Sequence, residues 1–359
     1  MQHGIVFYRP ANFAANYRGM TGDCPGFRGI GAIGQTAAAM ARQPGVACTE
    51  AGARSRYVAT SLRRWLHRPT ATDVRDTAAC DWKAAMRVST TIRFSPGKEP
   101  HDRLLSRVAD YARRIEASGF PGIWVGDSLG RGRPTLDPLI ELSVLAAVTD
   151  RVELGISVLQ LPLRHPIELA HRVQSVQALS GNRLRLGVGS GSTRADFELL
   201  GYDYDHRFGI MKRSLETMRR AWRGEPVNAG GALSLWPGCE GGPPILMGAW
   251  RSPRWITFAA QECQGWTPSG RFSSWNDLEH GMRIYREAGG GNAVLANVAI
   301  DLANRPESAG LTEVATSLVC PPDEARRRLK RIEQLGFDEV LLVSPANRLE
   351  DIERARDFL

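Results

Sequence analysis

Lysine is scarce in this chain, although the chain is basic. Four lysines (Lys83, Lys98, Lys212 and Lys330) stand among 46 basic residues, and the formal net charge is +8. Nearly all of the positive charge is therefore arginine, and arginine runs such as residues 326–328 lie among acidic residues, as is typical of solvated helix faces. The sequence has no stripe of basic and aromatic residues of the kind that holds single-stranded nucleic acid. We therefore expect no nucleic-acid partner.

The sequence also lacks paired cysteines, metal-ligand spacing and long apolar runs. Its six cysteines are far apart and form no C-x-x-C pair, so they are typical of free thiols in a reducing compartment and give no zinc spacing. No apolar run approaches the ~20 residues that a transmembrane helix needs. The first residues do not show a charged start followed by an apolar stretch, which is the pattern of a secretory signal. We therefore expect a cytoplasmic protein with no metal site and no membrane partner.

Residues 1–85 differ in composition from the rest of the chain. They are rich in glycine, alanine and arginine, contain scattered aromatic residues and show no sustained period of 2 or 3.6 residues. Such a segment cannot bury enough apolar surface to form a core by itself. Met86 then directly precedes a strand-like run. We predict that residues 1–85 are an N-terminal extension, disordered or mistranslated, and that residues 86–359 form one domain.

From Met86 onward, predicted strands and helices alternate. Each strand is a short apolar or alternating run, and each helix is amphipathic or bounded by capping residues. The predicted strands cover residues 87–93, 122–126, 152–159, 183–188, 245–248, 264–267, 293–302 and 339–343. The predicted helices cover residues 102–118, 137–148, 166–179, 208–223, 252–262, 274–288, 323–336 and 349–358. Eight strand–helix units in about 270 residues predict an α/β fold of the (β/α)8 TIM-barrel type rather than an open doubly wound sheet.

The stretch from Arg183 to Ser192 is the most distinctive part of this domain. Charged and apolar residues alternate along its first half, which predicts a strand with two different faces that ends in a glycine-rich turn. Glycines remove Cβ atoms where the backbone comes close to another group, and the following hydroxyl residues suit an anion such as phosphate. A plain tight turn between strand and helix is an equally good interpretation. The residues concerned are Gly187, Gly189, Ser190, Gly191, Ser192 and Thr193.

A barrel enzyme places its site at the carboxyl ends of the strands, where this chain offers few catalytic groups. Asp127 is the one acid at a predicted strand end, and His206 lies in the loop after the fourth strand. These two residues are the candidate catalytic residues. No Ser-His-Asp set, carboxylate pair or metal cluster converges on the strand ends. Such a site is typical of an enzyme whose cofactor carries the reactivity.

Several motifs of the predicted barrel resemble the bacterial-luciferase-like flavin oxidoreductase superfamily. The most specific is Leu161–Pro166 (LPLRHP) followed by Leu179–Gly189 (LSGNRLRLGVG). Supporting motifs are Gly119-Phe120 with Ile123–Val125, then Ala221–Pro226 (AWRGEP) and Leu335–Val340 (LGFDEV). The motifs cover the whole barrel in order, and none falls within residues 1–85.

This resemblance implies a TIM barrel that binds FMN, or the 8-hydroxy-5-deazaflavin coenzyme of many relatives, at the carboxyl ends of its strands. Members of the superfamily are monooxygenases that use reduced flavin and O₂, or dehydrogenases and reductases that transfer hydride. Their contacts to the cofactor phosphate follow strands four and five. With neighbouring strand ends, the predicted cofactor-binding residues are Ser128, Gln160, Gly189, Ser190, Gly191, Ser192, Gly248, Ala249, Trp250 and Ser252.

The chain departs from the superfamily pattern at three places. Several luciferase-type members carry an arginine at the position of Ser190 and a Glu-Ser pair at the position of Ala249-Trp250. The acid–histidine pair that often ends the second strand is Asp127-Ser128 here. An aspartate at this strand end is also compatible with deazaflavin-using relatives, so both cofactors stay open.

A flavin-type ring is broad and largely apolar, so its pocket should have apolar walls. The candidates for these walls are Phe94, Leu159, Trp250 and Trp266. Filling of the barrel core explains the large side chains equally well. The loop 193–207 and the segment 224–244 are candidates for a mobile lid.

We therefore predict an enzyme, a flavin-dependent oxidoreductase of the monooxygenase kind that uses reduced FMN and O₂ on a small organic substrate. Deazaflavin-dependent hydride transfer is an alternative. A phosphate-ligand barrel enzyme without flavin and a non-catalytic binding protein are further alternatives. The expected partners are a small-molecule substrate, a separate flavin reductase and a second copy of the chain in a homodimer.

Overall fold

The computed structural model describes residues 85–95, 101–129, 132, 134–303, 305–345 and 347–358, without the side chains of residues 101 and 102. The predicted extension over residues 1–85 lies, except for its last residue, outside the described residues and stays a prediction.

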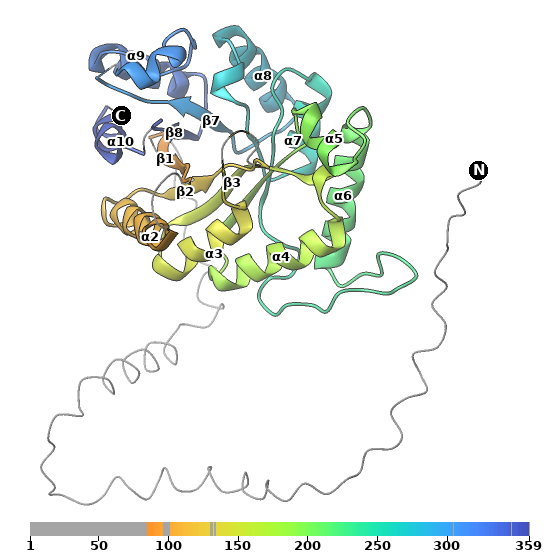
Figure 1. The fold of residues 1–359 in the computed structure, drawn as a ribbon. Coiled ribbons are helices and arrows are strands. Elements are labelled where there is room, and N and C mark those ends of the chain that lie inside the picture. Colours follow the sequence, from red (N-terminus) through yellow and green to blue (C-terminus); the bar gives the residue numbers. More distant parts are fainter. Residues whose placement is uncertain are drawn as a thin grey trace, which may run out of the picture. The chain divides into compact units, whose positions relative to one another are not determined.

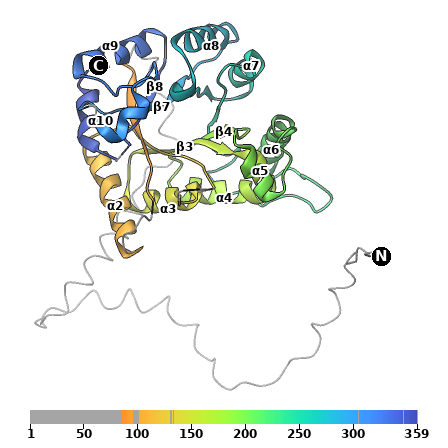
Figure 2. The same ribbon diagram turned by 45° about the horizontal axis from the view of Figure 1, so that its top comes forward.

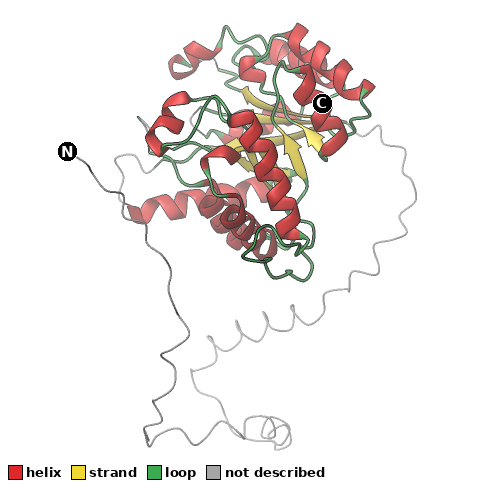
Figure 3. Ribbon diagram, turned by 90° about the vertical axis from the view of Figure 1, so that its right-hand side faces the viewer, coloured by secondary structure: helices red, strands yellow, loops and turns green. Residues whose placement is uncertain are grey.

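Eight parallel strands form the centre of the described part of the chain, inside a ring of helices (Figures 1 and 3). Their order is β6-β5-β4-β3-β2-β1-β8-β7, and isolated parallel bridges from Trp266 to Ala293 and from Ser269 to Ala296 connect the two ends of the sheet. The sheet is therefore a nearly closed barrel, which confirms the predicted TIM-barrel fold. The strands are β1 (Arg87–Ile92), β2 (Gly122–Val125), β3 (Glu153–Gln160), β4 (Leu184–Gly189), β5 (Ile245–Met247), β6 (Gly265–Trp266), β7 (Val294–Ala299) and β8 (Glu339–Val343).

The eight predicted helices begin and end within three residues of their predicted bounds. Asp137 caps its helix as predicted, because its side chain accepts hydrogen bonds from the amides of Leu139 and Ile140. The helices are α2 (His101–Ala117), α3 (Pro138–Val148), α4 (Pro166–Leu179), α5 (Arg194–Leu200), α6 (Arg207–Trp222), α7 (Pro253–Glu262), α8 (Trp275–Glu287), α9 (Pro322–Gln334) and α10 (Leu349–Arg356). Short 3₁₀ turns are η1 (Leu161–Leu163), η2 (Gly270–Phe272) and η3 (Pro306–Leu311).

Helix α5 was not predicted, because the sequence over residues 193–207 was interpreted as one polar loop. That interpretation is wrong for residues 194–200, which form a short helix that lies beside α6 (Figures 1 and 2). None of the described helices is long and apolar enough to cross a membrane.

The strands have two different faces, as the alternation in β4 predicts. Leu184, Leu186 and Val188 belong to the large core between the sheet and the helices. Arg185 faces the barrel interior, where its guanidinium lies 5.1 Å from the ring centre of Trp124. The interior carries a separate small apolar cluster of Trp124, Leu246, Val294, Ala296 and Leu341.

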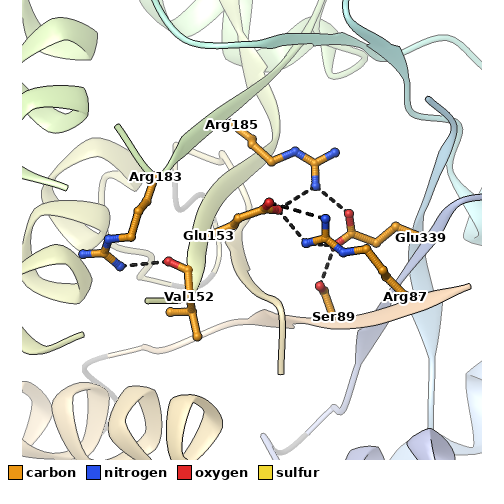
Figure 4. Close-up of polar contacts among 7 residues, drawn as sticks. All are labelled: Arg87, Ser89, Val152, Glu153, Arg183, Arg185 and Glu339. Carbon is orange, nitrogen blue, oxygen red and sulfur yellow. Dashed lines mark hydrogen bonds and ion pairs between the residues drawn. The ribbon is translucent and has the colours of Figure 1, made fainter. Parts of the chain in front are cut away.

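Charged side chains fill the interior at the amino ends of the strands (Figure 4). Arg185 Nη1 lies 2.5 Å from Glu339 Oε2 and 2.9 Å from Glu153 Oε2. Arg87 Nη2 lies 2.7 Å from the same oxygen of Glu153, and the Ser89 hydroxyl donates to Glu339. Because this end of the barrel is occupied by its own ion pairs, the opposite end is where a ligand is expected, as in other TIM barrels.

Candidate functional site

The two predicted phosphate loops begin side by side at the carboxyl ends of β4 and β5. These strands are direct neighbours, with Val188 opposite Met247, and the Gly248 amide donates to the Val188 carbonyl at 2.8 Å. The loop after β4 starts at Ser190, which is partly buried, and continues to the exposed Ser192. The structure therefore brings together the two segments that the sequence assigns to one ligand.

Three glycines of this region make room for Val158 of β3. A Cβ atom on Gly189 would lie 2.7 Å from Val158 Cγ2, and one on Gly248 would lie 3.1 Å from Val158 Cγ1. A Cβ on Gly187 would lie 3.3 Å from Val158 Cγ1 and 2.3 Å from the Ile156 carbonyl oxygen. The pairing of β3 with β4 changes register between Ile156 and Leu159, which brings Val158 to this inner side. Close packing within the barrel thus accounts for the missing side chains without a ligand.

Gly191 is different, because its backbone requires glycine. Its φ is +75°, and a Cβ atom there would lie 2.9 Å from Gln160 Oε1 and 3.0 Å from the Phe197 ring. The Gln160 side chain in turn donates to the Asp127 carbonyl at 3.3 Å. The ends of β2, β3 and β4 are therefore held together around Gln160, a predicted cofactor-binding residue.

Asp127, the first candidate catalytic residue, is engaged at both carboxylate oxygens. Arg164 donates to Oδ2 at 2.6 Å and to Oδ1 at 2.8 Å, and the backbone N–H of Gln160 donates to Oδ2 at 2.8 Å. The Asp127 side chain is 1% exposed. Burial opposes the charge of Arg164, but the hydrogen bonds with Asp127 outweigh it and raise the pKa of Arg164. This geometry favours a positioning role for Asp127, and its catalytic role stays a prediction.

His206, the second candidate, lies on the surface before α6. Its Nδ1 is 2.6 Å from Asp203 Oδ2, and its side chain is 79% exposed. The backbone and side-chain hydrogen bonds from His206 lower the pKa of Asp203. Ser128 is exposed as well. A role of either residue in binding or catalysis stays a prediction.

Most of the expected apolar walls lie elsewhere. Trp266 is fully buried against Tyr285 and Phe337, outside the barrel, and Phe94 and Leu159 belong to the same core between sheet and helices. The core interpretation of these three residues is therefore the right one. Trp250 is 38% exposed and stacks on Phe272, with ring centres 4.8 Å apart. The neighbouring Ala249 is buried, and its carbonyl accepts from the Trp266 indole.

Three buried hydroxyls near the carboxyl ends of the strands were not singled out from the sequence. Thr91 Oγ1, Ser157 Oγ and Thr267 Oγ1 have no hydrogen-bond partner among the described residues. Thr91 has the same parity in β1 as Ser89 and therefore faces the barrel interior, whereas Ser157 lies where the pairing of β3 with β4 changes register. Thr267 follows the outward-facing Trp266 and therefore points inward too. Counting every second residue along each predicted strand would have found Thr91 and Thr267.

A groove of about 730 Å³ lies outside the barrel, between α6 and α7. Lys212, Arg219, Arg254, Trp255 and Phe258 contribute to its lining. It is separate from the strand ends. Among the described residues, no group of three or more histidine, cysteine or acidic side chains is placed to hold a metal ion.

Two curated relatives are similar to this chain over less than half of its length. The 4-hydroxyprotoasukamycin monooxygenase of Streptomyces nodosus subsp. asukaensis is 30% identical over 167 residues, which are 44% of this chain and 45% of the relative. The 5,10-methylenetetrahydromethanopterin reductase of Methanolobus tindarius is 29% identical over 171 residues, which are 46% and 50%. The chain thus spans about half the length of these relatives.

Two solved structures share the fold. The oxygenating constituent of 3,6-diketocamphane monooxygenase from Pseudomonas putida, in complex with FMN, has a TM-score of 0.61 at 14% identity, covering 76% of this chain and 96% of that one. An F420-dependent secondary alcohol dehydrogenase in complex with an F420-acetone adduct has a TM-score of 0.62 at 12% identity, covering 77% and 98%. At these identities the likeness concerns the fold alone.

The family of this chain is assigned from its sequence, because the fold alone does not identify a family. The family model of luciferase-like monooxygenases matches residues 86–309, from the start of the barrel to η3, and includes both phosphate loops. The family contains flavin- and deazaflavin-dependent oxidoreductases, in agreement with the resemblance of the LPLRHP and LSGNRLRLGVG motifs. The chain belongs to the luciferase-like monooxygenase family.

Proposed function

We propose that this protein is a flavin-dependent monooxygenase that uses reduced FMN and O₂ on a small organic substrate. The observation that carries the proposal is the set of three buried, unpaired hydroxyls near the carboxyl ends of neighbouring parts of the barrel, on Thr91, Ser157 and Thr267. A buried polar group without a partner costs stability, so three of them at one end of a barrel indicate that a ligand completes their hydrogen bonds.

The residues present fit a flavin. The pyrimidine part of the ring has alternating carbonyl and N–H groups along its edge, and hydroxyls can both donate to and accept from such an edge. The deazaflavin ring shares this edge. The loops that start at Ser190 and Gly248 offer amides and hydroxyls to the phosphate tail.

When bound, the reduced cofactor supplies the electrons for oxygenation or the hydride for reduction. The chain binds and orients it. We propose that Asp127 and Arg164 position the end of β3. Asp127 pairs with Arg164 and accepts from the backbone N–H of Gln160, whose side chain lies beside Gly191 in the loop after β4. The stacked pair Trp250 and Phe272 offers an exposed apolar surface beside the loop after β5 for an organic substrate.

Deazaflavin-dependent hydride transfer is the second candidate. Ser190 stands where several luciferase-type members carry arginine, and Ser128 stands where their histidine often follows the acid. The similarity to a methylenetetrahydromethanopterin reductase supports the same alternative. For the monooxygenase, we further propose a separate flavin reductase as the electron source and a homodimer as the assembly.

Binding titrations with FMN and with the deazaflavin coenzyme, followed by flavin fluorescence, test the proposal and choose between the cofactors. O₂ uptake that depends on a flavin reductase, NADH and an added substrate then tests the monooxygenase. If neither cofactor binds, the proposed function is wrong, and a phosphate-ligand barrel without flavin or a non-catalytic binding protein becomes the better interpretation.

Thr91→Val tests the hydroxyls directly. We expect it to weaken flavin binding about three- to tenfold, since it removes one hydrogen bond to the ligand, while the ligand-free protein becomes no less stable. Thr90→Val is the matched control on the same strand. The Thr90 hydroxyl donates to the Leu342 carbonyl at 3.3 Å, so this change should lower stability and leave flavin binding as it was. If the two variants changed flavin binding equally, the Thr91 hydroxyl would not be a contact of the flavin.

A further inference from the structure

The Arg207 guanidinium lies close to two aromatic rings at the start of α6. Its central carbon is 3.9 Å from the ring centre of Tyr204 and 4.5 Å from that of Phe208. Cation–π contact with two rings fixes the orientation of the guanidinium and removes part of its water. Arg207 is only partly exposed as a result.

The charge of Arg207 has no carboxylate partner among the described residues. Its Nη1 donates to the Tyr204 carbonyl at 2.9 Å, and its buried Nε has no hydrogen-bond acceptor there. The nearby Asp205 forms an ion pair with Arg194, with Arg194 Nη2 2.6 Å from Asp205 Oδ1. The hydrogen bond from Arg194 is the main cause of the lowered pKa of Asp205, and Arg207 contributes least. A guanidinium that is fixed, partly desolvated and unpaired is suited to bind an anionic ligand.

One of the two rings beside Arg207 contacts a predicted phosphate loop, and the other contacts the helix that follows the second loop. The Tyr204 hydroxyl donates to the Ser192 carbonyl at 3.2 Å, in the loop after β4. Phe208 stacks on Trp255, with ring centres 5.6 Å apart, in the first turn of α7. That helix begins directly after Ser252, the last predicted contact in the loop after β5. Arg207 is thus connected to the loop after β4 through Tyr204, and to the first turn of α7 through Phe208.

We propose that Arg207 binds the phosphate of the cofactor. The inference rests on the proposed function, because it requires a cofactor with a phosphate tail. FMN carries a phosphate monoester and the deazaflavin coenzyme a phosphodiester, and a guanidinium can donate charge-assisted hydrogen bonds to either. Sequence reasoning missed Arg207 because the aromatic contact that connects it with α7 comes from Trp255, far away in the chain.

The test compares ligands with and without the phosphate. Affinities of the full chain for FMN and for riboflavin are measured by fluorescence titration, and the ratio isolates the phosphate contribution. We expect Arg207→Gln to weaken FMN about ten- to hundredfold and to leave riboflavin unchanged, because one charged hydrogen-bonding group is lost. Arg207→Lys should restore part of the preference for FMN. The deazaflavin coenzyme and 8-hydroxy-5-deazariboflavin, which has the same ring but no phosphate, form a second pair for the same comparison.

Arg194→Gln is the matched control. Arg194 also contacts Tyr204, at 4.4 Å, but its charge is paired with Asp205, so its loss should not change the ratio. If Arg207→Gln is folded by circular dichroism and keeps the wild-type ratio in the pair that binds, Arg207 does not bind the phosphate, and the proposed function stands. If the wild-type protein binds no member of either pair, the proposed function fails and this inference fails with it.

Discussion

Arg164 binds Asp127 through two parallel hydrogen bonds, of 2.6 Å and 2.8 Å, and both side chains are largely removed from water. Asp137, the cap of α3, lies 3.7 Å from the same guanidinium. The pair therefore connects the end of β2, the start of α3 and the segment after β3. An aspartate that the sequence singles out for chemistry is thus part of the ion pairs that hold these three segments of the barrel together.

Asp127→Asn should destabilise the protein by about 3 kcal/mol, since it removes the negative charge that faces the largely buried Arg164 and one of the two hydrogen bonds between them. Urea unfolding followed by circular dichroism measures the loss. The control is Glu168→Gln, which removes the partner of Arg172 in a pair whose side chains are about half exposed, and should cost less than about 0.5 kcal/mol. Similar losses in both variants would show that burial of the Asp127 pair contributes nothing.

The barrel could be predicted because its signals are local. Alternation in residues 183–188 and the Asp137-Pro138 capping pair depend on neighbours in sequence, and both are found in the structure. Helix α5 could not be predicted in the same way. It buries Phe197 but exposes Leu199 and Leu200, so its apolar residues form no stripe of helical period.

The site was predictable only as far as the order of the strands. Neighbouring strands bring Ser190 and Gly248 together, and a barrel guarantees this once the strands are assigned. The reason for the glycines was not predictable. Val158 reaches Gly189 because β3 changes register before Leu159, and nothing in the local sequence indicates that shift.

Gly189→Ala tests this explanation of the glycines. The new methyl group would lie 2.7 Å from Val158 Cγ2, so we expect a loss of about 1–3 kcal/mol in unfolding free energy. Val158→Ala in the same chain should recover most of that loss, because it removes the colliding atom. Both values come from urea unfolding of the single and double variants.

Gly187→Ala is the matched control for that recovery. Its methyl group would lie 2.3 Å from the Ile156 carbonyl oxygen, which belongs to the backbone, so Val158→Ala should bring little relief. Equal recovery at both glycines would contradict a specific contact between Gly189 and Val158.

Acid should weaken the ion pairs at the amino ends of the strands. Burial acts to raise the pKa of Glu153, but its bonds with Arg87 and Arg185 outweigh burial and lower it. The unfolded chain binds a proton at Glu153 near its ordinary pKa, and the folded chain does so only at lower pH. The stabilisation is thus present above the ordinary pKa and is lost as the pH falls through the lowered one.

Glu153→Gln should therefore flatten the decline in stability between about pH 6 and about pH 3. The measurement is the urea midpoint at a series of pH values. Glu279→Gln is the control, because Glu279 is exposed and forms no ion pair among the described residues. If the urea midpoint of Glu153→Gln fell with pH as steeply as that of the wild type, other carboxylates would govern acid unfolding.

A rise in pH from mildly acidic to about 8 should lower the stability of the protein through Glu141. Glu141 is 5% exposed in α3, its Oε1 has no hydrogen-bond partner among the described residues, and burial raises its pKa to about 8. Between its ordinary pKa and about 8, the folded protein keeps a proton that the unfolded chain releases. Stability must therefore fall as the pH rises through this range and level off above it.

Glu141→Gln removes that proton while keeping the size of the side chain. We expect it to match the wild type near about pH 5 and to exceed it at about pH 8.5 by an amount on the order of a few kcal/mol. Unfolding free energies at both pH values, again with Glu279→Gln as the exposed control, decide the matter. Because an amide cannot ionise, a decline in Glu141→Gln as steep as that of the wild type would mean that Glu141 is charged in the folded protein at neutral pH.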